Sequence, residues 1–272
     1  MKSNPTLGFT ELADENRWLA DLIFFPFYRI SHRAVTAPRS DGCGVLLIPG
    51  FLSGDYSLGP LAGGLEALGY RVFFSGIWYN VDCPDHTLPR LEKALLKAYN
   101  ETHQRVVLIG HSLGGLYARE LACRFPNLVA RAILLGSPVK DPYKSPNRVL
   151  LPVFAWWHRR CAGGSIGSPG AEGGEPSLNP PVVPETLIYS KTDGVVHWQN
   201  CIESGPAVEA IEVSSSHCGL PYRPEVFEII VERLARCTSE VIGPPLLPPR
   251  GDGASSLATA GLTSGQGARR VV

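Results

Sequence analysis

The sequence predicts an α/β fold in which a mostly parallel central sheet carries helices on both faces and an inserted cap. Three observations lead to this prediction. Short apolar runs recur along the chain, amphipathic helical patterns separate them, and one long insertion interrupts the alternation. Alternating strands and helices are typical of βαβ units, whose crossover connections place helices on the two faces of a parallel sheet.

Six apolar runs are the predicted strands. Several of them are continuous rather than alternating, as expected for strands that are buried on both faces. Most are followed by Gly or Ser, which are common where a strand turns into a loop. The predicted strands are Val45–Ile48, Val72–Phe74, Val106–Ile109, Ala132–Leu135, Thr186–Tyr189 and Ala210–Val213.

Apolar residues at helical spacing predict four helices between and after these strands. The first, second and fourth sets recur at three- or four-residue steps, and each forms one apolar face, whereas Leu116 and Ala122 of the third set are six residues apart. Pro224 precedes the last set and suits the first turn of a helix. The sets are Leu61, Leu65 and Leu68; Leu88, Leu91, Leu95 and Tyr99; Leu116, Ala122 and Phe125; and Val226, Ile230, Leu234 and Cys237.

The same patterns divide the chain into one domain with two flanking segments. We expect residues 1–40 to pack on the domain as an N-terminal segment and residues 41–242 to form the domain itself. Residues 138–184 interrupt the alternation as a cap insertion, and its second half is rich in Gly, Pro and Ser, which is typical of a flexible loop. Residues 243–272 lack apolar periodicity, which predicts a disordered tail.

Charge balance argues against partners that bind through charge. The chain of 272 residues has 25 Lys and Arg against 25 Asp and Glu, and no basic run stands out. We therefore expect no nucleic-acid partner, because phosphate contacts need a basic excess. The start of the chain lacks the pattern of a signal peptide, which predicts a cytoplasmic location. The apolar run at 19–28 is too short to span a bilayer. It is expected to pack on the domain, with transient contact to a membrane or lipid as the alternative.

Cysteines and histidines provide no clear metal or disulfide pattern. Seven scattered cysteines and the absence of CxxC do not indicate a disulfide framework or a zinc ribbon. A disulfide between Cys83 and Cys201 is a hypothesis, because both fall on loops at the same predicted edge of the sheet. His197 with Cys201, or His158 with Cys161, lacks a second pair at metal spacing, so no metal site is predicted.

A candidate nucleophile follows the third predicted strand. Gly110-His111-Ser112-Leu113-Gly114-Gly115 is a G-x-S-x-G motif between a strand and a helix. The glycines let strand and helix approach closely, so that Ser112 Oγ stands above the sheet at the helix N-terminus. The alternatives are an ordinary glycine-rich turn and a phosphate-binding loop. The second lacks the lysine and the glycine spacing that such loops need.

A serine hydroxyl needs a histidine base that is oriented by a carboxylate. Asp193 and His217 follow the fifth and sixth predicted strands, in the chain order Ser, acid, His that this architecture uses. Asp141, after the fourth strand, is the alternative acid. His111 is expected to shape the turn and the pocket rather than to act as base. His86 and His197 are expected to be surface or pocket-lining residues.

Acyl transfer also needs hydrogen-bond donors for the developing oxyanion. The backbone N–H of Leu113, which follows the serine, is one candidate, and the other should come from the turn after the first strand. There Gly50 permits the backbone geometry and the Phe51 N–H is the expected second donor, with Leu52 as the alternative. The competing interpretation of this turn is a purely structural Pro-Gly loop.

Together these motifs resemble the α/β-hydrolase superfamily, and more narrowly bacterial lipase-like esterases. The likeness covers roughly residues 44–236, and the glycine-rich insertion and proline-rich tail depart from it. It implies a serine hydrolase without a cofactor. The motifs that carry it are Leu47-Ile48-Pro49-Gly50-Phe51, Gly110-His111-Ser112-Leu113-Gly114-Gly115, Gly136-Ser137-Pro138, Asp193-Gly194-Val195-Val196 and Ser216-His217.

The reaction expected from these residues is hydrolysis of a carboxylic ester, either a small apolar ester or a lipid. Thioester hydrolysis or acyl transfer with the same three residues is the alternative within the enzyme class. A non-catalytic hydrolase-like binding protein is the alternative outside it. Large side chains near the predicted site loops are candidate substrate contacts, against ordinary core packing. They are Leu52, His111, Trp78, Trp156, Trp157 and Trp198.

Overall fold

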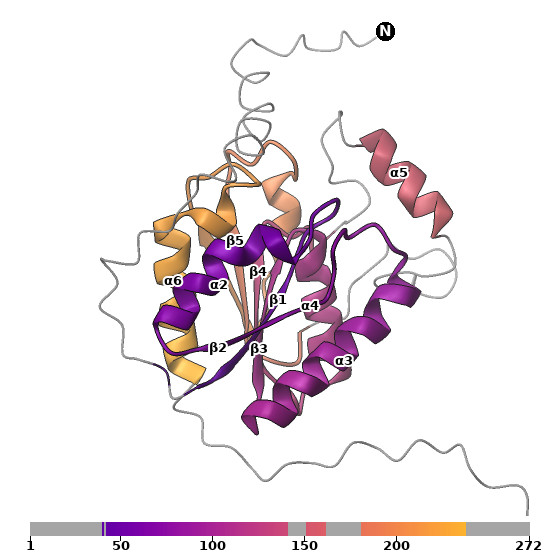
Figure 1. The fold of residues 1–272 in the computed structure, drawn as a ribbon. Helices are drawn as coiled ribbons and strands as arrows, with labels where there is room; N and C mark the ends of the chain where they lie inside the picture. Colours follow the sequence, from indigo (N-terminus) through magenta and orange to yellow (C-terminus); the bar gives the residue numbers. More distant parts are fainter. Residues whose placement is uncertain (1–39, 41, 141–150, 162–180, 238–272) are drawn as a thin grey trace, which may run out of the picture.

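The computed structural model describes residues 40, 42–140, 151–161 and 181–237 (Figure 1). Its centre is a sheet of six strands in the order β2-β1-β3-β4-β5-β6, in which every neighbouring pair is parallel. This confirms the predicted fold class. The strands are β1 (Gly44–Ile48), β2 (Arg71–Phe74), β3 (Val106–His111), β4 (Val129–Leu135), β5 (Glu185–Tyr189) and β6 (Val208–Glu212).

Each strand coincides with a predicted apolar run, and the largest difference is at β4. That strand begins at Val129 rather than Ala132, because a polar residue, Arg131, interrupts its apolar pattern. Arg131 is accommodated within the sheet by donating a hydrogen bond of 3.1 Å to the Thr186 hydroxyl on β5. An apolar run therefore underestimates the length of a strand that contains one hydrogen-bonded polar side chain.

Helices cover both faces of the sheet, as predicted (Figure 1). Apolar side chains of α3 and α4 join one buried cluster, and those of α2 and α6 join the other. Most of the residues predicted to form apolar faces lie in these clusters. The helices are α2 (Gly59–Ala67), α3 (Pro84–Thr102), α4 (Leu113–Arg124), α5 (Leu151–Arg160) and α6 (Pro224–Cys237), with short 3-10 turns η3 (Asp55–Leu58), η4 (Trp198–Cys201) and η5 (Leu220–Tyr222).

The described part of the predicted cap is α5 together with the two ends of the insertion. Residues 141–150 and 162–180 lie outside the described residues, and so does the alternative acid Asp141. The predicted N-terminal segment, except Ser40, and the predicted tail also lie outside them. The Ser40 N–H donates to the Leu68 carbonyl oxygen at 2.9 Å, at the end of α2.

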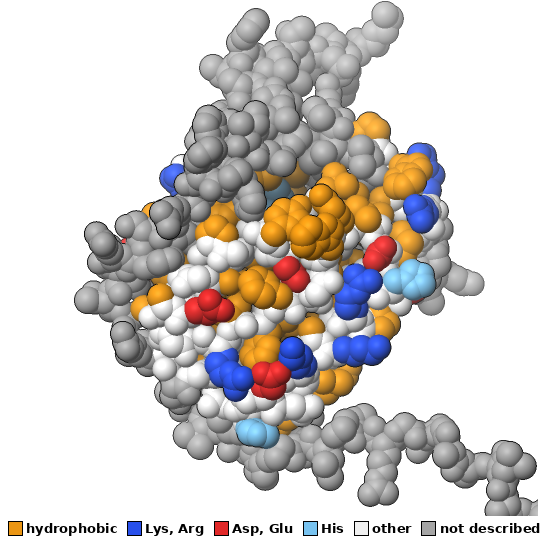
Figure 2. Space-filling model, viewed as in Figure 1, with side chains coloured by type: hydrophobic (Ala, Val, Ile, Leu, Met, Phe, Trp, Pro, Cys, Tyr) orange, Lys and Arg blue, Asp and Glu red, His pale blue; other side chains and the backbone are white. Residues whose placement is uncertain are grey.

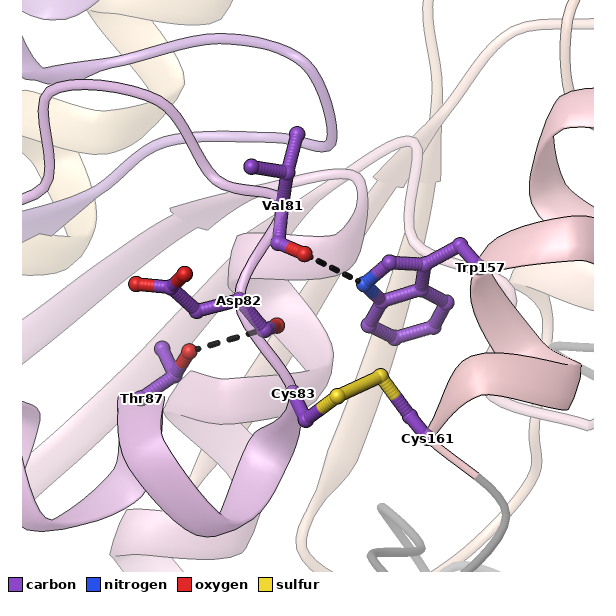
Figure 3. Close-up of a disulfide and its surroundings, with 6 residues drawn as sticks. All are labelled: Val81, Asp82, Cys83, Thr87, Trp157 and Cys161. Carbon is purple, nitrogen blue, oxygen red and sulfur yellow. Dashed lines mark hydrogen bonds between the residues drawn. A yellow bond between two sulfur atoms is a disulfide. The ribbon is translucent and has the colours of Figure 1, made fainter.

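The structure contradicts the hypothesis of a disulfide between Cys83 and Cys201. Cys83 at the start of α3 is bonded to Cys161 just after α5, with 5.3 Å between the two Cα atoms (Figure 3). Cys201 is a buried free thiol that lies among Val195 and Val196 in a separate small cluster. The hypothesis correctly placed Cys83 on the loop after β2. It missed that α5 of the insertion packs beside that loop.

A buried ion cluster joins α4 to the other half of the sheet. The Arg119 side chain is 1% exposed and bonds both carboxylate oxygens of Glu185, the first residue of β5. It also contacts the Glu203 carboxylate at 2.6 Å. Because the Arg119 charge is paired on two sides, the helix that begins at the G-x-S-x-G turn is fixed against β5.

Hydrophobic side chains gather on the face viewed in Figure 2. Within the described ranges, no helix is long and apolar enough to cross a bilayer. The exposed large hydrophobic residues are Leu52, Tyr56, Phe74, Trp78, Tyr79, Val81, Trp156 and Val182.

Candidate active site

Ser112 lies on a strained turn between β3 and α4. Its φ of 53° and ψ of −120° are unusual for a residue with a side chain, a conformation that costs roughly 1–3 kcal/mol. A Cβ atom added at Gly110 would lie 2.3 Å from the Gly114 oxygen, and one added at Gly114 would lie 2.2 Å from the Ile48 oxygen. The turn therefore closes only with glycine at both positions, which is the steric role predicted for them.

His217 and Asp193 are directly hydrogen-bonded. His217 Nδ1 lies 2.7 Å from Asp193 Oδ2, and both side chains are buried. The other carboxylate oxygen accepts the N–H groups of Val195 at 2.8 Å and Val196 at 2.9 Å. Since these three bonds occupy both oxygens, the carboxylate can orient the imidazole in one direction.

Hydroxyl groups tie the loop of Asp193 to the loop of His217. The Ser190 hydroxyl accepts the Ser215 N–H at 3.1 Å, and the Thr192 hydroxyl donates to the Ser215 carbonyl at 3.1 Å. Ser190 and Thr192 are also within 3.0 Å of each other. Two segments that follow different strands are thus held as one unit around the histidine–carboxylate pair.

The His111 ring packs against the His217 ring. Its Nε2 lies 3.0 Å from the His217 carbonyl oxygen, and the two rings are 4.8 Å apart. Burial lowers the pKa of His111 to about 3, and the nearby His217 charge adds to the shift. His111 is therefore neutral, and because a carbonyl oxygen only accepts, Nε2 carries its proton.

The turn after β1 lies beside Ser112. A Cβ atom at Gly50 would be 3.2 Å from Ser112 Cβ, so the backbone of this turn passes close to the serine. The Leu52 N–H donates to the Asn80 carbonyl at 3.1 Å, which leaves Phe51 as the better candidate oxyanion donor of the two. Leu113 is the first residue of α4, where the N–H has no partner within the helix.

Asn80 supports the candidate site, although no sequence motif pointed to it. It is buried, its side-chain Nδ2 donates to the Pro49 carbonyl at 2.8 Å, and its backbone N–H donates to the Ser53 carbonyl at 2.7 Å. Together with the bond from Leu52, Asn80 holds the turn after β1 at three points. The available signal was its place on the loop that follows β2, at the carboxyl edge of the sheet.

The candidate substrate contacts fall into separate groups. Trp157 is buried and its ring lies 5.5 Å from that of Phe51. Trp78 is 74% exposed and contacts Tyr56 and Tyr79, while Trp156 is 54% exposed beneath the Arg160 guanidinium.

Trp198 contacts residues of β5 and of the loop that follows it. Its ring stacks on Tyr189 at 6.1 Å, and the Lys191 ammonium lies 5.3 Å from the ring centre. Of the candidate contacts, the His111 ring reaches the His217 loop and the Trp157 ring reaches Phe51. Leu52 is itself on the turn after β1, and the Trp78 backbone passes close to Gly54 at the end of that turn.

Two alternative chemistries concern the described part of the chain, a metal site and the Cys201 thiol. No group of three or more His, Cys, Asp or Glu side chains there could hold a metal ion. Cys201 lies near Asp193, but burial raises the pKa of its thiol well above the ordinary value, and the Asp193 charge raises it further. A protonated thiol is a poor nucleophile, so Cys201 does not compete with Ser112.

Solved structures with a similar fold and a family model match this chain. Aspergillus fumigatus lipase B is 18% identical over 75% of this chain and 54% of its own, with a TM-score of 0.55. The esterase RhEst1 from Rhodococcus sp. ECU1013 is 17% identical over 74% of this chain and 92% of its own, with a TM-score of 0.51. At these identities the likeness concerns the fold. No curated protein matches the sequence. A model of the Alpha/beta hydrolase family matches residues 45–248, and the chain therefore belongs to that family.

Proposed function

We propose that this protein hydrolyses carboxylic esters, with Ser112 as nucleophile, His217 as base and Asp193 as its orienting carboxylate. The observation that carries the proposal is the 2.7 Å hydrogen bond between His217 and Asp193, two residues whose loops follow neighbouring strands. The strained turn that presents Ser112 supports it. Membership of a hydrolase family supports the reaction class.

The proposed reaction follows from the groups in place. Ser112 Oγ attacks the ester carbonyl while His217 Nε2 takes the hydroxyl proton, and Asp193 stabilises the resulting imidazolium. The N–H groups of Phe51 and Leu113 bind the negative oxygen of the tetrahedral intermediate. His217 then protonates the departing alcohol, and a water molecule that His217 deprotonates releases the acyl group from Ser112.

An apolar substrate suits the surroundings of Ser112. Phe51 and Trp157 place aromatic surface at the turn after β1, and Tyr56, Trp78 and Tyr79 form an exposed aromatic group over η3 and the loop after β2. Apolar walls with a few polar groups are typical of pockets for small apolar ligands. The solved structures with related folds include proteins named as an esterase and a lipase.

Replacing the nucleophile tests the proposal. The Ser112→Ala protein should lose ester hydrolysis and covalent labelling by an organophosphonate probe, while its thermal unfolding stays cooperative. Labelling of the alanine variant at the wild-type level would overturn the assignment. A folded wild type that neither hydrolyses esters nor reacts with the probe would instead favour a non-catalytic binding protein.

A second set of substrates defines the reaction further. A chain-length series of chromogenic esters, with and without a lipid interface, should give the highest kcat/KM for apolar acyl groups. Matched thioesters and a competing alcohol acceptor distinguish ester hydrolysis from thioester hydrolysis and acyl transfer. Faster turnover of the thioester than of its matched ester would reassign the substrate class but keep the same three residues.

The cytoplasmic location stays a prediction, and the disulfide provides a test of it. Disulfides persist in oxidising compartments and are rare in the cytoplasm. Thiol trapping with a maleimide at the moment of cell lysis should label Cys83 and Cys161 if the protein is cytoplasmic. A Cys83–Cys161 bond already present at lysis would place the protein in an oxidising compartment.

A further inference from the structure

Trp157 connects the insertion to the turn after β1. It is 3% exposed, and its indole Nε1–H donates to the Val81 carbonyl oxygen at 2.9 Å (Figure 3). The other side of the contact is the Phe51 ring, whose centre is 5.5 Å from that of Trp157. One side chain of α5 therefore contacts both the candidate oxyanion turn and the loop that supports it.

The disulfide fixes α5 at the same place. The Cys161 N–H donates to the Trp157 carbonyl at 3.0 Å, so the two residues are one helical turn apart. Cys161 is bonded to Cys83, two residues after Val81 (Figure 3). Trp157 and Cys161 thus hold neighbouring points of one loop, one by a hydrogen bond and the other by a covalent bond.

That loop in turn holds the candidate oxyanion donor. Asn80, next to Val81, accepts the Leu52 N–H and donates to the carbonyl groups of Pro49 and Ser53. The Phe51 N–H sits between Pro49 and Leu52 in the chain, so its direction depends on these bonds and on the contact of its own ring. To be effective, an oxyanion donor must lie within a few tenths of an ångström of hydrogen-bond distance from the reacting oxygen.

We infer that Trp157 is a positioning residue for the oxyanion turn and that the Cys83–Cys161 disulfide keeps it in place. The inference rests on the proposed function. A dithiol reductant should lower turnover by releasing α5. In that step the S–S bond breaks, each sulfur takes up one electron and one proton, and the dithiol closes to its own cyclic disulfide.

Substitutions of Trp157 in the full chain test the positioning role. We expect Trp157→Ala to lower kcat by about 10- to 100-fold with a smaller change in KM, the size expected when one oxyanion donor is misdirected. Trp157→Phe keeps a ring against Phe51 and should recover part of kcat. The control is Arg159→Ala on the exposed side of α5, which should retain wild-type kcat. Equal kcat in the alanine variant and the wild type would overturn the inference.

Reduction tests the role of the disulfide. Dithiothreitol should lower the kcat of the wild type and of Cys123→Ser, a variant that leaves the Cys83–Cys161 bond intact. The double variant Cys83→Ser/Cys161→Ser should start at the lowered kcat and no longer respond to the reductant. Full activity in the double variant would overturn the role of the disulfide.

Hydrogen exchange separates failure of this inference from failure of the proposed function. The Leu52 and Asn80 amides should exchange at least about tenfold faster in the reduced wild type and in Trp157→Ala than in the oxidised wild type. Unchanged exchange in both would overturn the inference even if esterase activity is found. Faster exchange in a protein that hydrolyses no ester would support the positioning contact and overturn the proposed function.

Discussion

The two sides of the candidate active site are held by different kinds of contact. On one side, Asp193 and His217 lie on loops that follow neighbouring strands, and hydroxyl groups and a buried carboxylate fix them locally. On the other side, the turn after β1 depends on Asn80 and on Trp157, which belongs to an insertion far along the chain.

The proton-transfer groups and the proposed oxyanion site are therefore supported in different ways. The first side is built on the sheet, so stability and chemistry should be separable there. The second side is assembled from separate segments and closed by a disulfide, so it should respond to changes far from Ser112. Four substitutions test whether the two sides behave so differently.

The largest expected effect is on the first side. Asp193→Asn should lower kcat by roughly 10⁴-fold, as the loss of the orienting carboxylate does in serine hydrolases of this mechanism. The amide oxygen can still accept the Val195 and Val196 N–H groups, so the fold should persist. Steady-state kinetics with thermal unfolding as control measures this effect. A loss below tenfold, together with a large loss in Asp141→Asn, would transfer the acid role to Asp141.

A second substitution tests whether stability and chemistry separate on the sheet side. Arg119→Ala leaves the Glu185 carboxylate buried without its partner, which costs about 3–5 kcal/mol of unfolding free energy. At a temperature where the variant is folded, kcat should stay near that of the wild type. Arg124→Ala, which breaks a half-exposed pair on the same helix, should cost less than about 1 kcal/mol. Equal losses of unfolding free energy in Arg119→Ala and Arg124→Ala, measured by urea unfolding, would contradict a stabilising role of the buried ion cluster.

On the second side, a single amide should affect both properties together. Asn80→Ala removes the bond to the Pro49 carbonyl and should cost about 1–3 kcal/mol. It should also lower kcat about tenfold, because the turn after β1 loses one of its supports. Asp82→Ala, on the exposed part of the same loop, is the matched control. A stability loss with unchanged kcat would show that the turn keeps its geometry without Asn80.

The last test concerns the pH dependence of stability and not kcat. Burial lowers the pKa of His111 to about 3, against about 6.5 in an unfolded chain. The unfolded state therefore binds more protons between these values, and stability falls as the pH is lowered from 6.5 towards 3. The slope of unfolding free energy against pH reports how many more protons the unfolded state binds. His111→Asn should reduce that number by up to about one between pH 3 and 6.5. Urea unfolding at several pH values measures it, with the exposed His86→Asn as control; an unchanged slope would contradict a neutral, buried His111.

Local patterns predicted the fold because each element carries its own signal. The apolar runs of β1 and β3, the steps of leucines on α3 and the glycines around Ser112 all act over a few residues. Position along the chain then placed Asp193 and His217 after neighbouring strands, and their hydrogen bond agrees with that placement.

Contacts between segments that are distant along the chain could not be predicted from local sequence patterns. The sequence suggested Cys201 as a possible partner of Cys83 and did not point to Cys161, the actual partner. The path of the insertion cannot be read from a sequence rich in Gly, Pro and Ser. The role of Asn80 was missed for the same reason, since it depends on the turn after β1, about thirty residues away. Trp157 was expected near the pocket, but not its bond to Val81.

The disulfide also acts on the unfolded chain. Its two cysteines are 78 positions apart, and they enclose β3, the Ser112 turn, α4 and β4. Closing a loop of that length reduces the entropy of the unfolded ensemble by an amount equivalent to about 4–5 kcal/mol. That is comparable with the whole stability of many small proteins, which begins at about 5 kcal/mol. The lifetime of this protein should therefore depend on the thiol chemistry of its surroundings as strongly as on any residue of its core.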